Sequence, residues 1–256
     1  MSQSDRNSAA NSLAGKRAVI TGGGSGIGAD MAVAFAKEGA EVTITGRREA
    51  TLQAVAEQYD GIRAAVVDVT DEASMVALFE NIGSVDIVIA NAGAAESAPF
   101  TKTSFEQWQR MLNVNLSGVF LTLREGLKQL NDGGRLIAVA STAGLKGYAY
   151  VGAYCAAKHG VVGLVRSLAA ETATRDMTVN ALCPGFTDTP LLAASVENIV
   201  TKTGQSAEQA TAHFQSTNPT GRLVTPAEVT ATALWLCGPN SGAINGQAIS
   251  ISGGEV

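Results

Sequence analysis

The 256-residue chain has few of the side chains that form disulfide bonds or bind transition metals. It contains three cysteines, Cys155, Cys183 and Cys237, and only two histidines, His159 and His213. The cysteines are odd in number, far apart in the sequence and form no CxxC pair, so neither a disulfide framework nor a clustered zinc site is expected. The sequence therefore predicts no bound metal, and reduced thiols of the kind found in cytoplasmic proteins.

Long apolar runs and basic clusters are also missing. No stretch of about 18 apolar residues occurs, and residues 1–7 are polar, without the apolar core of a signal peptide. The formal net charge is −5, whereas a nucleic-acid groove or an anionic membrane surface favours a positively charged partner. We therefore expect a cytoplasmic protein that binds neither membrane nor nucleic acid.

What the chain does contain is a regular alternation of short apolar runs and amphipathic segments. The apolar runs predict strands at 17–21, 42–45, 64–67, 86–90, 135–140, 178–182 and 248–251. The segments between them predict helices at 27–38, 49–58, 72–80, 104–130, 151–174 and 226–236. This alternation is typical of an α/β fold with a doubly wound parallel sheet of the Rossmann type, here with about seven strands covered on both faces. Such sheets bind ligands at the carboxyl ends of their strands, where the strand order reverses.

One domain is expected to span residues 15–256, after a disordered lead-in at 1–14 that is rich in Ser, Asn and Ala. The alternation is interrupted by a connection at about 186–221, which is polar in its middle and helical at 197–200 and 207–214. Long connections of this kind are often lids or binding loops. We expect this segment to contact the substrate.

A glycine-rich turn lies between the first predicted strand and the first predicted helix. Glycines let a pyrophosphate approach the start of a helix, where free N–H groups and the helix dipole favour anions. A P-loop would need Lys-Ser/Thr where this chain has Ala29-Asp30, and no serine fits the Gly-x-Ser-x-Gly of a nucleophile elbow. The predicted dinucleotide contacts are Gly22, Ser25, Gly26, Ile27 and Gly28. The alternative is a glycine-rich turn that binds nothing.

The end of the second predicted strand indicates which dinucleotide binds. NAD sites place an acid here to bond the ribose 2′-hydroxyl, whereas an arginine accommodates a 2′-phosphate. This chain has no acid here and carries Arg47 and Arg48, and a guanidinium group can hold a phosphate through two hydrogen bonds. NADP(H) is therefore the preferred cofactor, with NAD(H) still open. The other interpretation is that both arginines are merely solvated.

Tyr154 and Lys158 stand four residues apart in a run of small residues, which places them on one face of a predicted helix. A nearby positive charge stabilises a phenolate and would lower the Tyr154 pKa from its usual value of about 10 towards the range useful for acid–base catalysis. For this pair alone, an inward-packed tyrosine beside a solvated lysine is the simpler interpretation.

The motifs together resemble the short-chain dehydrogenase/reductase family, over about Gly15–Gly254. The matching residues are Thr21, Gly22, Gly26 and Gly28 of the glycine turn, the turn Asn91-Ala92-Gly93, the helix residue Asn115, Ser141, the pair Tyr154 and Lys158, and Pro184-Gly185 with Thr187 and Thr189. Each motif alone is weak evidence. Their order and spacing together make the resemblance specific.

The resemblance implies four catalytic residues. Tyr154 would be the general acid in ketone reduction and the base in alcohol oxidation, and Lys158 would bind the nicotinamide ribose and depress the Tyr154 pKa. Ser141 would hydrogen-bond the substrate oxygen, which gains negative charge as hydride arrives. Asn115 would hold a water that links Lys158 to solvent. Read without the resemblance, Ser141 could be a strand-end cap and Asn115 a locally bonded helix residue.

Further cofactor contacts are implied by the same resemblance. They are Asp68 and Val69 on the adenine side, Asn91, Ala92 and Gly93 along the cleft, and Pro184, Gly185, Thr187 and Thr189 against the nicotinamide, together with Tyr154 and Lys158. Asp68 and Thr187 could instead be turn residues bonded to nearby backbone. The resemblance also implies a homotetramer formed through the helices at 104–130 and 151–174.

The expected function is hydride transfer between a nicotinamide cofactor and a small-molecule ketone or secondary alcohol. The segment from Asn218 to Val229 resembles reductases of 3-oxoacyl thioesters and related hydroxy compounds. The alternatives are a polyol or cyclic secondary-alcohol dehydrogenase, a lyase or isomerase on the same fold, and a catalytically silent NADP-binding sensor. The sensor is disfavoured because Asn115, Ser141, Tyr154 and Lys158 are all present.

Overall fold

The computed structural model describes residues 12–256. Its seven strands are β1 (Arg17–Thr21), β2 (Glu41–Gly46), β3 (Ile62–Val66), β4 (Val85–Ala90), β5 (Leu130–Val139), β6 (Met177–Pro184) and β7 (Ala248–Ile251). The α-helices are α2 (Gly26–Lys37), α3 (Glu49–Ala56), α4 (Glu72–Ile82), α5 (Phe105–Leu112), α6 (Gly118–Gln129), α7 (Gly152–Glu171), α8 (Pro190–Thr203), α9 (Ala207–Thr217) and α10 (Pro226–Cys237). Within residues 12–256, no helix is both long and apolar enough to cross a membrane.

The strands form one parallel sheet in the order β3-β2-β1-β4-β5-β6-β7. The order reverses between β1 and β4, so a ligand of this sheet is expected at the carboxyl ends of those two strands. All six residues of β4 and all eight of β6 are buried, which is the pattern of a parallel sheet covered on both faces. The predicted doubly wound fold is confirmed.

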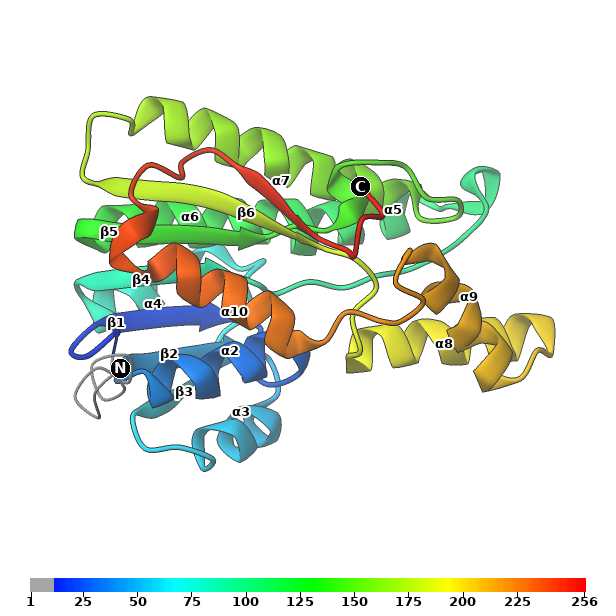
Figure 1. Ribbon diagram of the computed structural model, residues 1–256, viewed down its shortest axis with the longest axis horizontal. Coiled ribbons are helices and arrows are strands. Elements are labelled where there is room, and N and C mark those ends of the chain that lie inside the picture. Colours follow the sequence, from blue (N-terminus) through cyan, green and yellow to red (C-terminus); the bar gives the residue numbers. More distant parts are fainter. Residues whose placement is uncertain (1–11) are drawn as a thin grey trace.

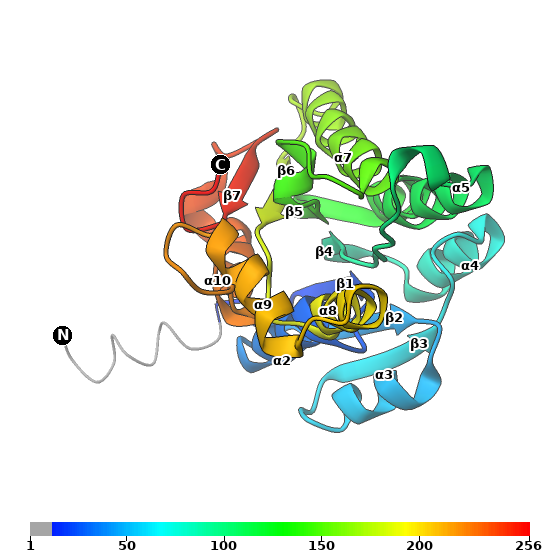
Figure 2. The same ribbon diagram turned by 90° about the vertical axis from the view of Figure 1, so that its right-hand side faces the viewer.

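Two helical layers cover the sheet (Figures 1 and 2). On one face, Phe35 of α2, Leu52 of α3 and Leu236 of α10 belong to one buried apolar cluster. On the other face, α4, α6 and α7 contribute Met75, Leu123 and Val161, among others, to a second cluster. Both clusters include side chains of the strands as well as of the helices, so they hold the sheet and the helices in fixed relative positions.

The expected disordered lead-in at 1–14 is only partly testable, because residues 1–11 lie outside the described residues. Its last three residues do not fit the expectation. Leu13 is only 2% exposed, and its backbone N–H donates to the carbonyl of Glu38 at 2.9 Å. The side chain of Ser12 also donates to the Glu38 carboxylate at 2.9 Å. A single buried leucine, not visible as a periodic pattern, ties this turn to the end of α2.

Two long segments are divided in ways that the sequence pattern did not show. The helix expected at 104–130 consists of α5, a π-helical turn at Asn113–Ser117 and α6. The connection at 186–221 holds α8 and α9, both longer than the helical parts expected there. In Figure 1 these two helices lie beyond the tips of the strand arrows, at the end of the sheet where ligands bind.

Candidate active site

The turn after β1 is joined to the turn after β4 by hydrogen bonds around Thr21. The side-chain amide of Asn91 donates to the carbonyls of Thr21 at 2.9 Å and Gly22 at 3.2 Å. The Thr21 hydroxyl accepts from the backbone N–H groups of Asn91 at 3.0 Å and Ala92 at 3.1 Å. Asn91 therefore supports the glycine turn from within, a role that its place in a motif did not reveal.

Two positions of the turn must be glycine, because neighbouring atoms of the protein lie too close for a side chain. Gly22 has φ +68°, and a Cβ there would lie 2.8 Å from the Cα of Ala92. A Cβ at Gly28 would lie 2.5 Å from the carbonyl oxygen of Gly22. Either substitution would push apart the two loops that line the switch between β1 and β4.

The start of α2 suits a pyrophosphate. Its N-cap residue Ser25 makes no side-chain capping bond, and its first turn contains no acidic residue. The first N–H groups of a helix have no partner within the helix, and together with the helix dipole they favour an anion. Gly26 and Ile27 lie in this first turn, and a Cβ at Gly26 would be 3.2 Å from the Thr189 side chain. The glycine turn therefore faces the start of α8.

On the side where adenosine is expected, Asp68 and Val69 follow β3. The Asp68 carboxylate accepts from the backbone and the hydroxyl of Thr70 at 2.9 and 2.8 Å, so it does form the local turn that was its alternative interpretation. Val69 is 7% exposed and packs against Gly118, where a Cβ would approach it within 2.7 Å. Both residues are placed by the protein itself before any ligand binds.

Arg47 and Arg48 lie in the turn between β2 and α3, and both are exposed. No ion pair of the described residues involves either guanidinium group. The Arg48 backbone caps α3, and its carbonyl accepts from the hydroxyl of Thr51 at 2.9 Å. Two uncommitted positive charges therefore stand beside the end of β2, which fits a phosphate on the ribose.

Tyr154 and Lys158 project from α7 towards the end of β5. The Lys158 ammonium lies 5.6 Å from the centroid of the Tyr154 ring, and it donates to the carbonyl of Val139 at 2.8 Å. Lys158 is 3% exposed. The interpretation of the pair as an inward tyrosine beside a solvated lysine is therefore wrong, because the lysine is buried and bonded.

The pKa values of the pair differ from what the sequence suggested. Burial raises the pKa of Tyr154 to about 12, although a hydrogen bond with Ser141 opposes the rise. Burial also lowers the pKa of Lys158 to about 8. The expected depression of the Tyr154 pKa by Lys158 is not present, because desolvation acts on both groups and the ammonium lies over the ring face. In this state the phenol is a proton donor.

The other two candidate catalytic residues are held by backbone. The Ser141 hydroxyl accepts from the backbone N–H of Ala143 at 3.1 Å, so it is a cap, and it also bonds the Tyr154 phenol. Asn115 is fully buried within the π-helical turn. Its amide donates to the carbonyls of Ala94 at 2.9 Å and Met111 at 3.0 Å, and its oxygen accepts from the N–H of Ala94 at 3.1 Å.

Gly93 lies between Asn115 and Lys158. A Cβ at Gly93 would be 2.9 Å from the Asn115 side-chain oxygen and 3.8 Å from the Lys158 nitrogen. The structure thus brings these three predicted residues together. Extra turns of the π type are frequent at functional sites, and this one is what turns the Asn115 side chain towards the loop after β4.

The segment after β6 closes the other side of the cleft. The Thr187 hydroxyl donates to the carbonyl of Gly185 at 2.9 Å, and the Thr189 hydroxyl caps α8 by accepting from the N–H of Leu192 at 3.4 Å. Both predicted threonines therefore shape the segment that follows Pro184 and Gly185. Both threonines are held in place by these hydrogen bonds within the protein.

An aromatic wall, made of Tyr148, Phe186 and Phe214, stands beside this segment. The ring of Phe186 lies 5.6 Å from that of Tyr148, edge to face, and 4.7 Å from that of Phe214. On the opposite side, Asn198 of α8 donates to the hydroxyl of Ser97 at 3.1 Å. The connection at 186–221 therefore contacts both Tyr148 and Ser97, and its contact with substrate stays a prediction.

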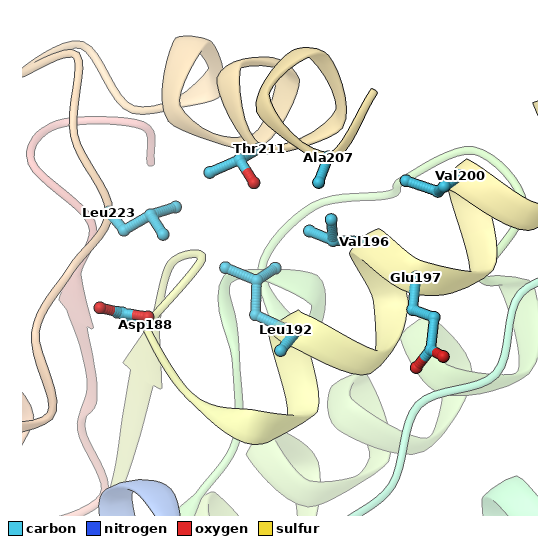
Figure 3. A pocket seen from close by; sticks show the side chains of 9 residues that line it. Asp188, Leu192, Val196, Glu197, Val200, Ala207, Thr211 and Leu223 are labelled. Atoms are coloured by element: carbon cyan, nitrogen blue, oxygen red, sulfur yellow. The ribbon is translucent and has the colours of Figure 1, made fainter. Parts of the chain in front are cut away.

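An apolar groove of about 390 Å³ opens between α8 and α9 (Figure 3). Leu192, Val196 and Val200 line it from α8, and Ala207 and Thr211 line it from α9. None of the predicted catalytic residues lines the groove. The groove is therefore separate from the residues expected to perform the reaction.

Sequence reasoning missed three polar residues of the site. Thr21 was recognised only as part of a motif, Tyr148 was not noticed, and Glu255 lies far from every motif. The Tyr148 hydroxyl donates to the Glu255 carboxylate at 2.6 Å across 107 residues of sequence. No local signal could have found that pairing, since only the neighbouring positions of β5, β6 and β7 bring the two residues together.

The residues present fit a nicotinamide dinucleotide. The free start of α2 suits the pyrophosphate, the unpaired Arg47 and Arg48 suit a phosphate on the ribose, and Tyr154 and Lys158 lie where the strands end. Methyl groups at Gly22 and Gly28 would clash with the neighbouring turns and so distort the glycine turn. The chemistry that this arrangement offers is proton transfer at a phenol with a buried lysine beside it.

The lowered Lys158 pKa predicts a pH-dependent stability. Between about pH 8 and the value of 10.5 for a free lysine, the unfolded chain binds a proton at Lys158 that the folded chain does not, so the contribution of Lys158 to the free energy of unfolding rises with pH. Lys158→Met should remove this rise, which is on the order of 3 kcal/mol over the window. Urea unfolding at pH 7, 8, 9 and 10 measures it, and parallel curves for the two proteins would contradict the assignment.

Comparisons with known proteins cover nearly the whole chain. A protein-family model described as Enoyl-(Acyl carrier protein) reductase matches residues 22–255. The D-beta-hydroxybutyrate dehydrogenase of Cupriavidus necator is 36% identical, over 95% of this chain and 99% of that protein. The 3-oxoacyl-[acyl-carrier-protein] reductase of Aquifex aeolicus is 33% identical, over 94% of this chain and 98% of that protein. A crystal structure of an actinorhodin polyketide ketoreductase variant with NADPH has a TM-score of 0.88 and 32% identity, covering 96% of this chain and 98% of that one.

Proposed function

The chain belongs to the short-chain dehydrogenase/reductase family, and on that premise we propose that it reduces 3-oxoacyl compounds, or oxidises the matching hydroxy compounds, with NADP(H). The reaction class is hydride transfer between a nicotinamide cofactor and a ketone or secondary alcohol. The observation that carries the proposal is the partly buried Tyr154 with the buried Lys158 beside it at the end of β5.

In ketone reduction, Tyr154 donates its proton to the carbonyl oxygen of the substrate. Its raised pKa keeps the phenol protonated at neutral pH until the substrate oxygen becomes basic. Ser141 donates its hydroxyl proton to the same oxygen in place of its bond to Tyr154, and so stabilises the charge that develops there. The bound cofactor supplies the hydride.

Lys158 takes part in the proton exchange that follows the loss of the Tyr154 proton. The lowered pKa of Lys158 lets its ammonium exchange protons near neutral pH, next to the phenolate that Tyr154 becomes. Asn115 is hydrogen-bonded to the loop at Ala94, and these bonds keep the neighbouring Gly93 next to Lys158. We propose this loop as the route by which the pair is connected to solvent.

The preference for NADP(H) rests on the two unpaired guanidinium groups after β2. Asp68, Val69, Asn91, Ala92 and Gly93 would line the adenosine and ribose side. Pro184, Gly185, Thr187 and Thr189 would lie against the nicotinamide. These assignments are carried over from the family motif, and their support here is that the fold gathers them at the carboxyl ends of β1, β3, β4 and β6.

The substrate is the least constrained part of the proposal. The relatives include a 3-oxoacyl reductase and a hydroxybutyrate dehydrogenase, so ethyl 3-oxobutanoate and cyclohexanone should each be assayed with NADPH and with NADH, and a polyol series with NADP⁺ and with NAD⁺. We expect NADPH-dependent reduction of the 3-oxo ester. Turnover of cyclohexanone or polyols alone would favour the alternative dehydrogenases, and no turnover at all would contradict the proposal.

A homotetramer is also proposed. Phe105 of α5 is 68% exposed and Phe120 of α6 is 43% exposed, so the helices expected at the subunit interface carry apolar surface of the kind that association covers. Sedimentation velocity measures the assembly, and a stable monomer would refute it. A cytoplasmic location, supported by the free thiols of Cys155, Cys183 and Cys237, stays a prediction for cell fractionation.

A further inference from the structure

The loop at residues 94–98, which follows β4, is hydrogen-bonded at both of its ends to segments that carry the proposed chemistry. At one end, the backbone N–H and carbonyl of Ala94 bond the side chain of Asn115, at 3.1 and 2.9 Å. At the other end, the backbone N–H of Ala98 donates to the carbonyl of Tyr150 at 2.8 Å. A displacement of this loop therefore reaches Asn115 and also the turn that leads into α7, the helix that carries the proposed acid.

The turn before α7 has an unusual backbone conformation. Tyr150 has φ +68° and is the only residue other than glycine with a positive φ within residues 12–256. A side chain in this left-handed region is strained, and such strain persists where surrounding contacts enforce it. The hydrogen bond from Ala98 is one of those contacts. The loop after β4 thus helps to hold the backbone that precedes Tyr154 in a conformation that costs free energy.

Between its two ends, the loop is bonded to α8 through Ser97. The side-chain amide of Asn198 donates to the Ser97 hydroxyl at 3.1 Å, and the Lys202 ammonium lies 3.5 Å from the Ser97 carbonyl oxygen. Asn198 and Lys202 are four residues apart, so both reach the loop from one face of α8. The loop also forms an exposed ion pair, between Glu96 and Arg110, which involves α5 and not α8.

The helices α8 and α9 are only lightly packed on the rest of the protein. Leu192 is the only buried residue of α8, and Ala210 is the only buried residue of α9. The apolar groove of about 390 Å³ separates the two helices, which project beyond the strand tips (Figures 1 and 2). Elements with few buried contacts open at a low cost in free energy. The bond from Asn198 to Ser97 therefore matters for how firmly α8 is held against the loop.

We propose that Asn198 is a positioning residue: by bonding Ser97, it holds the loop at 94–98 in the arrangement that proton transfer requires. The inference rests on the proposed function, because that function places the proton route at Asn115 and Lys158. While α8 lies against the loop, the loop is fixed at its middle as well as at its ends. When α8 moves away, the loop is free to shift, and small displacements of catalytic groups lower reaction rates strongly. Proton transfer is thereby coupled to the position of α8.

Ser97→Ala and Asn198→Ala should each lower kcat for ethyl 3-oxobutanoate at least about fivefold, while the Kd for NADPH changes less than about twofold. The double variant should be no slower than the slower single variant, because both substitutions remove the same interaction. Ser97→Thr keeps the hydroxyl and should retain the wild-type kcat. Arg110→Met is the matched control, because it breaks the exposed ion pair of the same loop and should change kcat less than about twofold.

A solvent isotope effect separates positioning of the loop from simple closure of the cleft by α8. If proton transfer is slowed, the ratio of kcat in H₂O to kcat in D₂O should be larger for Asn198→Ala than for the wild type. If Asn198 only kept α8 closed over the products, its loss would speed their release. The value of kcat would then rise without an increase in the isotope effect, and that result would overturn the inference.

A measurement without turnover distinguishes this inference from the proposed function. Amide hydrogen exchange of the NADPH-loaded chain, followed by NMR, should be about tenfold faster at Ala94 and Ala98 in Asn198→Ala, and unchanged in Arg110→Met. Such a result in a protein that reduces no ketone would support the ordering of the loop by Asn198 and reject the proposed function. Unchanged exchange in Asn198→Ala, additive losses in the double variant, or equal effects from Arg110→Met would overturn the inference.

Discussion

Tyr154→Phe should reduce the turnover of a ketone substrate by at least about a thousandfold, while the affinity for NADPH changes less than about twofold. The substitution removes only the phenol oxygen, so the ring keeps its place beside Lys158, 5.6 Å from the ammonium. With the oxygen gone, the only remaining donor to the substrate oxygen is Ser141, whose hydroxyl is a far weaker acid than the phenol. The measurements are kcat and KM by NADPH absorbance, and the Kd for NADPH by calorimetry.

Tyr59→Phe is the matched control, because it removes the same atom from a tyrosine that is 38% exposed, close to the end of α3. It should leave both kcat and cofactor affinity unchanged. If Tyr154→Phe retained more than about a tenth of wild-type turnover, Tyr154 would not be the acid. If cofactor affinity fell together with turnover, the substitution would have disturbed the cleft, and the loss could not be assigned to proton transfer.

The sequence predicted the fold well because the fold depends on local apolar runs. Each strand of a parallel sheet is buried on both sides, so β4 and β6 appear in the sequence as mainly apolar stretches. The helices between them follow from periodicity. The division of 104–130 by a π-helical turn could not be predicted, because no residue there breaks helical periodicity, and the turn is set by Asn115 bonding the loop at Ala94.

The sequence predicted that Tyr154 and Lys158 lie together, but not how their surroundings shift their pKa values. Helical spacing placed Tyr154 and Lys158 on one face of α7, and the structure agrees. The sign of the Tyr154 pKa shift was wrong because it depends on burial, which the packing of α7 against β5 and β6 decides. Glu255 and Tyr148 were invisible for the same reason, since their contact arises only when distant strands are neighbours.

The second large effect is expected from Arg47 and Arg48. Replacing both by alanine should weaken the binding of NADPH about a hundredfold and that of NADH less than about threefold. Hydrogen bonds to charged groups contribute roughly 1.5–3 kcal/mol each, and exposure reduces this, so two guanidinium groups on one phosphate account for a change of that size. The measurement is the ratio of the two dissociation constants by calorimetry, with each single variant titrated to divide the effect between them.

Two controls make the assignment of Arg47 and Arg48 specific: the salt dependence of NADPH binding and a substitution far from the site. Both side chains are exposed, so raising the ionic strength from about 0.05 to 0.5 M should weaken NADPH binding in the wild type far more than in the double variant. Arg175→Ala changes an exposed arginine just before β6, at the opposite end of that strand from the site, and should leave the ratio as it is. If the ratio of the two dissociation constants were unchanged in the double variant, the turn after β2 would not bind the ribose phosphate of NADPH. The absence of an acid there would then make the cofactor choice depend on the glycine turn and Asp68 alone.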